Sequence, residues 1–313
     1  MERSDFVVDP ESWQGHPGED GEPEFPLLRV DTSPDGAYVA MQWPTSEPSG
    51  AIWGTKTRRL AYRPRGGVAF RWVAGGSRLL LVREVYLPNP RQTTRPSLLQ
   101  QDYSYSLELL AWPQRVTRSR IGVTLPMGWP SEVVTSPDER RIAVYWNDQG
   151  ECGCVFFCRD GDQLLPDTVM GNGLSIAGFN VSTRPVFSAN GDWLALGISI
   201  TDAWWTEPED LPARGGLLLC GFVVLCDCRH GGSSLPLPIM VETKAGWLPQ
   251  TDPISGLNEA QFFFVGTPRF SDAQTIAVPL GDGTTWTVAL PETIREKPSL
   301  HDFEAERDRF KSR

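Results

Sequence analysis

Short apolar stretches recur along the chain in pairs, and a tight polar turn joins the two members of each pair. The turns contain Ser, Asp, Asn, Gly or Pro. Gly accepts positive φ, Pro presets φ, and Asp or Asn hydrogen-bonds its own backbone, so these residue types favour hairpins. The flanking positions alternate or run apolar, which is typical of half-buried or buried strands. The five copies are Val30–Met41, Phe70–Val82, Val133–Trp146, Pro185–Ile198 and Arg269–Leu280.

A third apolar segment follows most of these hairpins, and a weaker fourth segment follows some of them. Repeats of about 40–50 residues with four strands are typical of propeller blades. The pattern therefore predicts an all-β fold: a single β-propeller of about five four-stranded blades. The long interval between the last two copies leaves room for a sixth blade around Gly221–Val241. The third segments are Ser106–Trp112, Cys152–Cys158, Gly215–Asp227 and Thr284–Leu290, and the clearest fourth segments are Val116–Leu125 and Ser233–Val241.

The turn sequences carry a resemblance to a known repeat. Ser33–Ala40 reads SPDGAYVA, and Ser136–Val144 and Phe187–Leu196 follow the same pattern less fully. This signature resembles the repeats of WD40-like and TolB-type propellers, whose blades carry an F-S-P-D-G-x-x-L/I-A/V core. No copy has the G-H and W-D dipeptides of a regular WD40 blade. The resemblance implies architecture, and because propellers host scaffolds, receptors and enzymes alike, it leaves the function open.

The two ends of the chain depart from the repeat. Residues 1–26 form an acidic segment, residues 27–291 are predicted to form the propeller, and residues 292–313 form a C-terminal tail. Phe6–Val8 could supply the outer strand that the last blade lacks, and so close the ring. Ser299–Phe310 begins like a capping box and places apolar residues near one face, which predicts a short C-terminal helix.

The charge of the chain limits its partners. A formal net charge of −10 over 313 residues would repel the phosphate backbone of nucleic acid, and it favours a basic protein partner. The first residues lack the apolar core of a signal peptide, and the longest apolar run, Leu217–Cys226, is too short to cross a bilayer. We therefore expect a cytoplasmic protein without membrane contact, with its cysteines reduced.

The six cysteines form two clusters at the predicted third strands of neighbouring blades. Within each cluster the residues share parity, so on a strand they lie on one face. Side chains two apart on a strand are about 6.6 Å apart, which is awkward for a zinc site built from paired cysteines. We expect packing in the core and no cofactor, with a zinc site or a redox sensor as the alternative. The residues are Cys152, Cys154, Cys158, Cys220, Cys226 and Cys228.

Three segments outside the repeat are candidates for partner binding. The loop Thr201–Arg214 contains two consecutive tryptophans, which cannot both face one side of a strand. The insertion Tyr86–Tyr105 is too long for a hairpin, and long insertions tend to be functional or disordered. The C-terminal helix adds two phenylalanines. The candidates are Trp204, Trp205, Tyr86, Arg91, Arg95, Tyr103, Tyr105, Phe303 and Phe310.

Recognisable catalytic motifs are absent from the sequence. It contains three histidines, and no H-E-x-x-H, G-x-S-x-G, Walker A, G-x-G-x-x-G or EF-hand pattern. We assign no catalytic residue and predict a non-catalytic scaffold or adaptor subunit of a larger complex that binds another protein. The alternative is a hydrolase or lyase with its site in the central funnel. Residues beside the inner strands would then form the site: Asp31, Arg71, Thr135 and Arg269.

Overall fold

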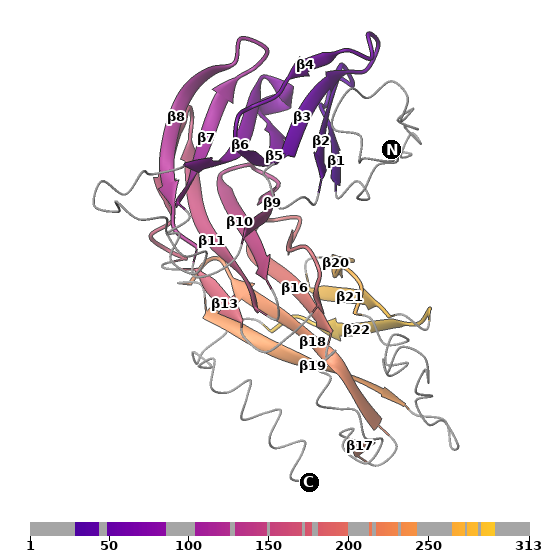
Figure 1. Cartoon of the computed structure of the whole chain (residues 1–313). Coiled ribbons are helices and arrows are strands. Elements are labelled where there is room, and N and C mark those ends of the chain that lie inside the picture. The colour runs from indigo at the N-terminus through magenta and orange to yellow at the C-terminus, as the bar shows by residue number, and fades with distance from the viewer. Residues whose placement is uncertain are drawn as a thin grey trace, which may run out of the picture. The chain divides into compact units, whose positions relative to one another are not determined.

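The computed structural model describes the chain as almost entirely β-sheet (Figure 1). The chain divides into two compact units, residues 1–123 and 124–313, and each is described by itself. None of the helices within the described ranges has the length and apolar character needed to cross a membrane. The described ranges are 29–43, 49–85, 104–125, 129–148, 151–170, 173–176, 181–199, 213–214, 217–230, 233–242, 265–272, 274–280 and 283–291.

The first unit contains two four-stranded antiparallel sheets, each with its strands in chain order. A 3₁₀ turn, Ala74–Gly76, joins the first two strands of the second sheet. The first sheet consists of β1 (Arg29–Thr32), β2 (Tyr38–Trp43), β3 (Ser49–Gly54) and β4 (Leu60–Tyr62). The second consists of β5 (Gly67–Val73), β6 (Arg78–Val85), β7 (Ser104–Ala111) and β8 (Val116–Val123).

The second unit contains three sheets, of five, six and three strands. The first consists of β9 (Trp129–Thr135), β10 (Arg141–Asp148), β11 (Glu151–Asp160), β12 (Gln163–Pro166) and β13 (Leu174–Ile176). The second consists of β14 (Val181–Ser182), β15 (Val186–Phe187), β16 (Trp193–Ser199), β17 (Ala213–Arg214), β18 (Leu217–Asp227) and β19 (Ser233–Glu242). The third consists of β20 (Arg269–Phe270), β21 (Thr275–Pro279) and β22 (Thr285–Ala289).

The five sheets of the described residues correspond to the five sequence copies, so the all-β prediction is confirmed. The four-strand prediction holds for the first two sheets and needs correction for the others. In the third sheet the extra strand β13 pairs with β11, and in the fourth the inner strand is broken into the two short strands β14 and β15. The blade count of the whole chain stays a prediction. The proposed ring-closing strand Phe6–Val8 and the C-terminal helix lie outside the described residues.

The repeated turns share one hydrogen-bonding arrangement. In the first, the Ser33 hydroxyl donates to Oδ1 of Asp35 at 2.6 Å and accepts the amide of Tyr38 at 2.9 Å. Because Ser33 is buried, its hydroxyl takes the place of water as the hydrogen-bond acceptor for the Tyr38 amide, which the tight turn would otherwise leave unpaired. The same two bonds, between 2.6 and 2.9 Å, join Ser136 to Asp138 and Arg141, and Ser188 to Asn190 and Trp193.

Turns of successive sheets also touch one another. A Cβ added at Gly76 would lie 3.1 Å from Cδ of Pro34, and one added at Gly191 would lie 3.4 Å from Cβ of Ser136. Both glycines have positive φ, at 89° and 74°. Glycine is favoured at both positions because it adopts positive φ and has no Cβ that would crowd the neighbouring turn.

The core lies between the sheets. Alternate residues of β18 show this, because successive side chains of a strand face opposite sides. Phe222 and Val224 belong to a buried cluster with residues of β10 and β11, whereas Val223 and Leu225 belong to one with residues of β21. The β18 sheet is thus buried on both faces. In the first unit, Trp72 packs edge-on against Trp112 with ring centroids 5.2 Å apart.

Candidate functional site

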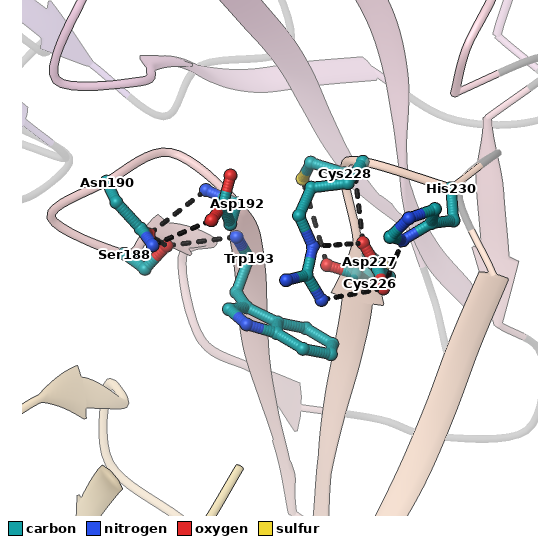
Figure 2. Close-up of polar contacts among 9 residues, drawn as sticks. Ser188, Asn190, Asp192, Trp193, Cys226, Asp227, Cys228 and His230 are labelled. Atoms are coloured by element: carbon teal, nitrogen blue, oxygen red, sulfur yellow. Dashed lines mark hydrogen bonds and ion pairs between the residues drawn. The ribbon is translucent and has the colours of Figure 1, made fainter. Parts of the chain in front are cut away.

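A buried carboxylate at the end of β18 organises the most polar cluster of the second unit. The side chain of Asp227 is 0% exposed. Its Oδ1 accepts hydrogen bonds from the backbone amide and Nε of Arg229, at 2.9 and 3.1 Å, and Oδ2 lies 3.0 Å from the Arg229 terminal nitrogen Nη2. Nδ1 of His230 lies 3.1 Å from Oδ2, as Figure 2 shows. The turn between β18 and β19 is therefore built around one carboxylate.

The protonation of this cluster follows from these contacts. Burial opposes ionisation of Asp227, but the hydrogen bonds from Arg229 and His230 outweigh it and lower the pKa of Asp227 to about 2. The hydrogen bond to Asp227 in turn raises the pKa of Arg229 above its usual value. At neutral pH the site consequently holds an ionised Asp227–Arg229 pair.

Two hairpin turns hold the pair in place. Trp193 of β16 lies opposite Asp227 of β18 in the sheet, and the Arg229 guanidinium lies 5.0 Å from the centroid of the Trp193 ring. The amide of Cys228 donates to the carbonyl of Asp192 at 2.8 Å, which connects this turn to the serine turn at Ser188. The cluster is thus held by contacts with the neighbouring strand and its turn.

His230 is the member of the cluster that solvent can reach, since its side chain is 58% exposed. When Nδ1 carries the proton, it donates to Asp227, and Nε2 is left as an acceptor or base directed away from that bond. The sequence analysis missed this arrangement, because it assigned no role to any of the three histidines. The signal was present in Asp227-Cys-Arg-His, an Asx turn at a strand end.

Four of the cysteines are buried in the core, where the sequence analysis expected them to pack. Cys152 and Cys154 of β11 share one buried cluster with Cys226 and Cys228 of the neighbouring sheet. Burial raises the pKa of the Cys154 and Cys226 thiols, and it raises that of Cys228 to about 12. Thiols that stay protonated at neutral pH pack as small apolar groups.

The metal hypothesis depends on the same residues. Within the ranges that the structure describes, no group of three or more His, Cys, Asp or Glu side chains is arranged to hold a metal ion. Cys158 is partly buried, and burial together with the nearby Asp167 raises the pKa of its thiol to about 11. Cys220 belongs to a part of β18 whose side chains are not described. The expectation of no cofactor and the zinc alternative both remain predictions.

Two of the funnel candidates are brought together. Asp31 of β1 lies 3.6 Å from the Arg71 guanidinium, and its carboxylate accepts the backbone amide of Trp72 at 3.2 Å. Asp31 thereby links the two sheets of the first unit. Thr135 is the last residue of β9 and Arg269 the first of β20, so each of the four candidates lies on the first strand of its sheet in chain order.

Most of the predicted partner-binding residues lie outside the described part of the chain. Tyr105 is described: it belongs to β7, and its side chain is buried at 2% exposure. Its contribution to partner binding stays a prediction. The residues outside the described ranges are Trp204, Trp205, Tyr86, Arg91, Arg95, Tyr103, Phe303 and Phe310.

Strand β8 provides a different candidate surface. It is the outermost strand of its sheet and, among the described residues, pairs with β7 alone. Most of its eight residues are exposed or partly exposed, including Val116 at 50%. Arg118 and Arg120 make the strand basic, in contrast to the net charge of the whole chain. A register shift opposite Leu109 and Leu110 distorts its pairing.

Comparison with known proteins adds information about the fold. No protein-family model and no curated protein matches the chain. Among solved structures it is similar to the hydrazine synthase of Kuenenia stuttgartiensis, with 12% identity, 95% of this chain and 86% of that chain covered, and a TM-score of 0.45. It is similar to TolB from Acinetobacter baumannii at 12% identity, covering 88% of this chain and 58% of TolB, with a TM-score of 0.39.

A third similar structure is the periplasmic gluconolactonase PpgL of Pseudomonas aeruginosa, at 12% identity. The match covers 88% of this chain and 73% of that chain, with a TM-score of 0.43. At such identities the likeness concerns the fold alone, and it does not distinguish an enzyme from a binding protein. The antiparallel sheets of the described residues agree with the all-β fold that the turn sequences predict, and TolB is among the solved structures to which the chain is similar.

Proposed function

We propose that the chain is a non-catalytic protein-interaction module, a scaffold or adaptor subunit, whose contact surface includes the outer strand β8. The observation that carries this proposal is the exposure of β8: an outer strand that presents both a large apolar side chain and arginines. Arginine is enriched at protein interfaces, and the buried centre of an interface is more apolar than the rest of the surface. The proposal extends to the predicted contacts through Trp204 and Trp205.

The charge expected of the partner depends on the distance over which the charges of this chain act on it. At physiological ionic strength charges are screened beyond about 8 Å, so the local charge of β8 governs direct contact. Overall attraction to a chain of net charge −10 favours a basic partner. We therefore infer a partner that is basic overall and contacts β8 with an acidic segment.

The test is quantitative affinity isolation from the source cells, followed by binding of the purified partner. Val116→Asp places a charge on β8, and Leu165→Asp places the same charge on β12, where Leu165 is 44% exposed. We expect a stoichiometric partner to be lost from Val116→Asp and retained by Leu165→Asp. Equal retention by both variants contradicts a role for β8. Replacing Trp204 and Trp205 by Ala in a further variant tests the predicted loop contact.

A second candidate function is favoured by the contact between Asp227 and His230. A histidine held by a buried carboxylate, with its other nitrogen exposed, is the arrangement of a general base in hydrolases and lyases. Its test is a substrate screen with the wild type and His230→Gln. An activity that His230→Gln reduces by about 100-fold or more would identify the chain as an enzyme.

A further inference from the structure

A second buried carboxylate, Glu108, lies in the middle of the strand next to β8. Its side chain is 0% exposed. In the sheet register Glu108 lies opposite Leu81 on β6 and opposite Arg120 on β8. A lone carboxylate in such a position would be strongly destabilising, because burial removes its hydration. Glu108 therefore depends on the cations around it.

Two arginines from different strands supply those cations. A terminal nitrogen of Arg120 lies 2.5 Å from Oε1 of Glu108, and one of Arg83 lies 3.4 Å from Oε2. The Ser106 hydroxyl adds a donor at 3.4 Å from Oε1. Arg83 also reaches the hydroxyl of Tyr62 on β4, at 3.4 Å. The carboxylate thus fixes two guanidinium groups on one face of the sheet.

The charges in this cluster do not cancel. Within the described ranges two guanidinium groups face one carboxylate, so one positive charge remains. Both arginines keep contact with solvent, since their side chains are 26% exposed for Arg83 and 55% for Arg120. The exposed parts of the two guanidinium groups can donate hydrogen bonds to an anion that approaches from solvent.

The space for an anion lies beside Arg120. Gly122 is two residues further along β8, on the same face of the strand, and it lies opposite Ser106 in the register. Among the residues that the structure describes, nothing lies within 4 Å of a Cβ added at Gly122. The position next to the two arginines is thus open.

We propose that Arg83 and Arg120 bind a carboxylate of the partner protein in the space beside Gly122. This rests on the proposed interaction function and names the chemistry of the segment that β8 receives. Guanidinium groups bind carboxylates through paired hydrogen bonds. One excess positive charge matches a monoanion, whereas a phosphate dianion would leave a negative charge close to Glu108. The carboxylate belongs to an acidic side chain or to a chain terminus.

The probe for this site is a short fluorescent peptide of alternating Gly and Glu, acetylated and amidated, measured by fluorescence anisotropy at 0.15 M salt with the full chain. We expect saturable binding that is absent for the same peptide with Gln in place of Glu. A Gly and Gln peptide with a free C-terminus distinguishes a terminal carboxylate from a side chain. Tighter binding of a phosphoserine peptide would overturn the assignment to a carboxylate, and so would an absence of binding by both carboxylate peptides.

Matched variants locate the binding. Arg120→Gln should weaken it about tenfold or more, because a charge-assisted pair is lost. Arg118→Gln removes the same charge from the same strand and should weaken binding clearly less than Arg120→Gln, because among the described residues Arg120 and not Arg118 forms the ion pair with Glu108. Gly122→Val fills the open space without changing the charge and should also weaken it. Equal effects of Arg118→Gln and Arg120→Gln, or full binding by Gly122→Val, would show that the peptide binds elsewhere.

The stability of Arg120→Gln needs its own control, because it leaves Glu108 with one cation fewer. Arg120→Lys retains the charge but not the planar pair of donors, and it should weaken binding while keeping the melting temperature close to that of the wild type. The peptide assay does not use the natural partner. If the peptides bind but no partner is lost from Val116→Asp, the proposed interaction function is wrong and the carboxylate site is retained. If a partner is lost from Val116→Asp but the peptides do not bind, the carboxylate site alone is rejected.

Discussion

Replacing Ser188 by Ala tests the idea that the repeated serine turns hold the hairpins together. The Ser188 hydroxyl is 1% exposed and accepts the amide of Trp193 at 2.9 Å while donating to Oδ1 of Asn190 at 2.7 Å. Alanine removes both bonds and leaves a buried backbone donor without a partner. No water can replace the hydroxyl without opening the turn, so the loss should appear directly as lower stability.

The magnitude follows from the cost of an unpaired buried donor. Leaving one such group unsatisfied costs about 1–3 kcal/mol. For a domain of about 150–250 residues, each kcal/mol lowers the melting temperature by about 2–4 °C. We therefore expect Ser188→Ala to lose about 2 kcal/mol and to melt about 4–8 °C below the wild type.

The assay is urea unfolding followed by tryptophan fluorescence, with thermal unfolding as a second measurement. Ser271 begins the corresponding turn of the last sheet, but it is exposed, and among the residues that the structure describes its hydroxyl bonds only the Thr275 carbonyl, at 3.3 Å. Ser271→Ala should cost less than about 0.5 kcal/mol. Equal losses for the two variants would refute the reasoning, since the buried amide would then contribute nothing.

Three further outcomes follow from the second unit. Asp227→Asn should lower the free energy of unfolding by about 2–3 kcal/mol near pH 7, because the pKa of the carboxyl is about 2 in the folded protein and about 3.9 in the unfolded chain. This contribution is present above pH ~4 and is lost as the pH falls towards ~2. The stabilities of wild type and variant should therefore converge in acid unfolding curves. Cys228, with its pKa of about 12, should react with iodoacetamide at pH 8 about 100-fold or more slowly in the native than in the unfolded protein; a native rate that rises on adding a chelator would instead support a metal site. Gly153→Ala should cost about 1–3 kcal/mol or more in urea unfolding, because its Cβ would lie 2.0 Å from the Leu174 carbonyl oxygen; a loss no greater than that of Gly122→Ala would contradict it.

The hairpins could be predicted from the sequence because their signals are local. Ser33, Ser136 and Ser188 each precede an Asp or Asn by two residues, and those two side chains alone define the turn. The broken inner strand of the fourth sheet could not be predicted in this way. The division between Val181–Ser182 and Val186–Phe187 depends on pairing with β16, which brings together residues from seven to eighteen positions apart.

The polar clusters were harder to predict because their partners are distant or their environment is decided by packing. In Ser106–Leu110 the alternation of polar and apolar residues would place Glu108 on a solvated face. Instead Glu108 is fully buried, because Arg83 and Arg120 come from the two flanking strands to meet it. The sequence near Glu108 does not indicate that Arg83 and Arg120, which lie far from it in the chain, contact it.

The two buried acids therefore differ in what they leave available. Asp227 is neutralised by one arginine two residues away, and their charges cancel, so the pair mainly stabilises its turn and positions His230. Glu108 faces two arginines from separate strands and leaves one positive charge next to open space at Gly122. A structural ion pair needs no excess charge, whereas an anion site does. This difference in charge balance directs the search for a partner to β8 rather than to the β18–β19 turn.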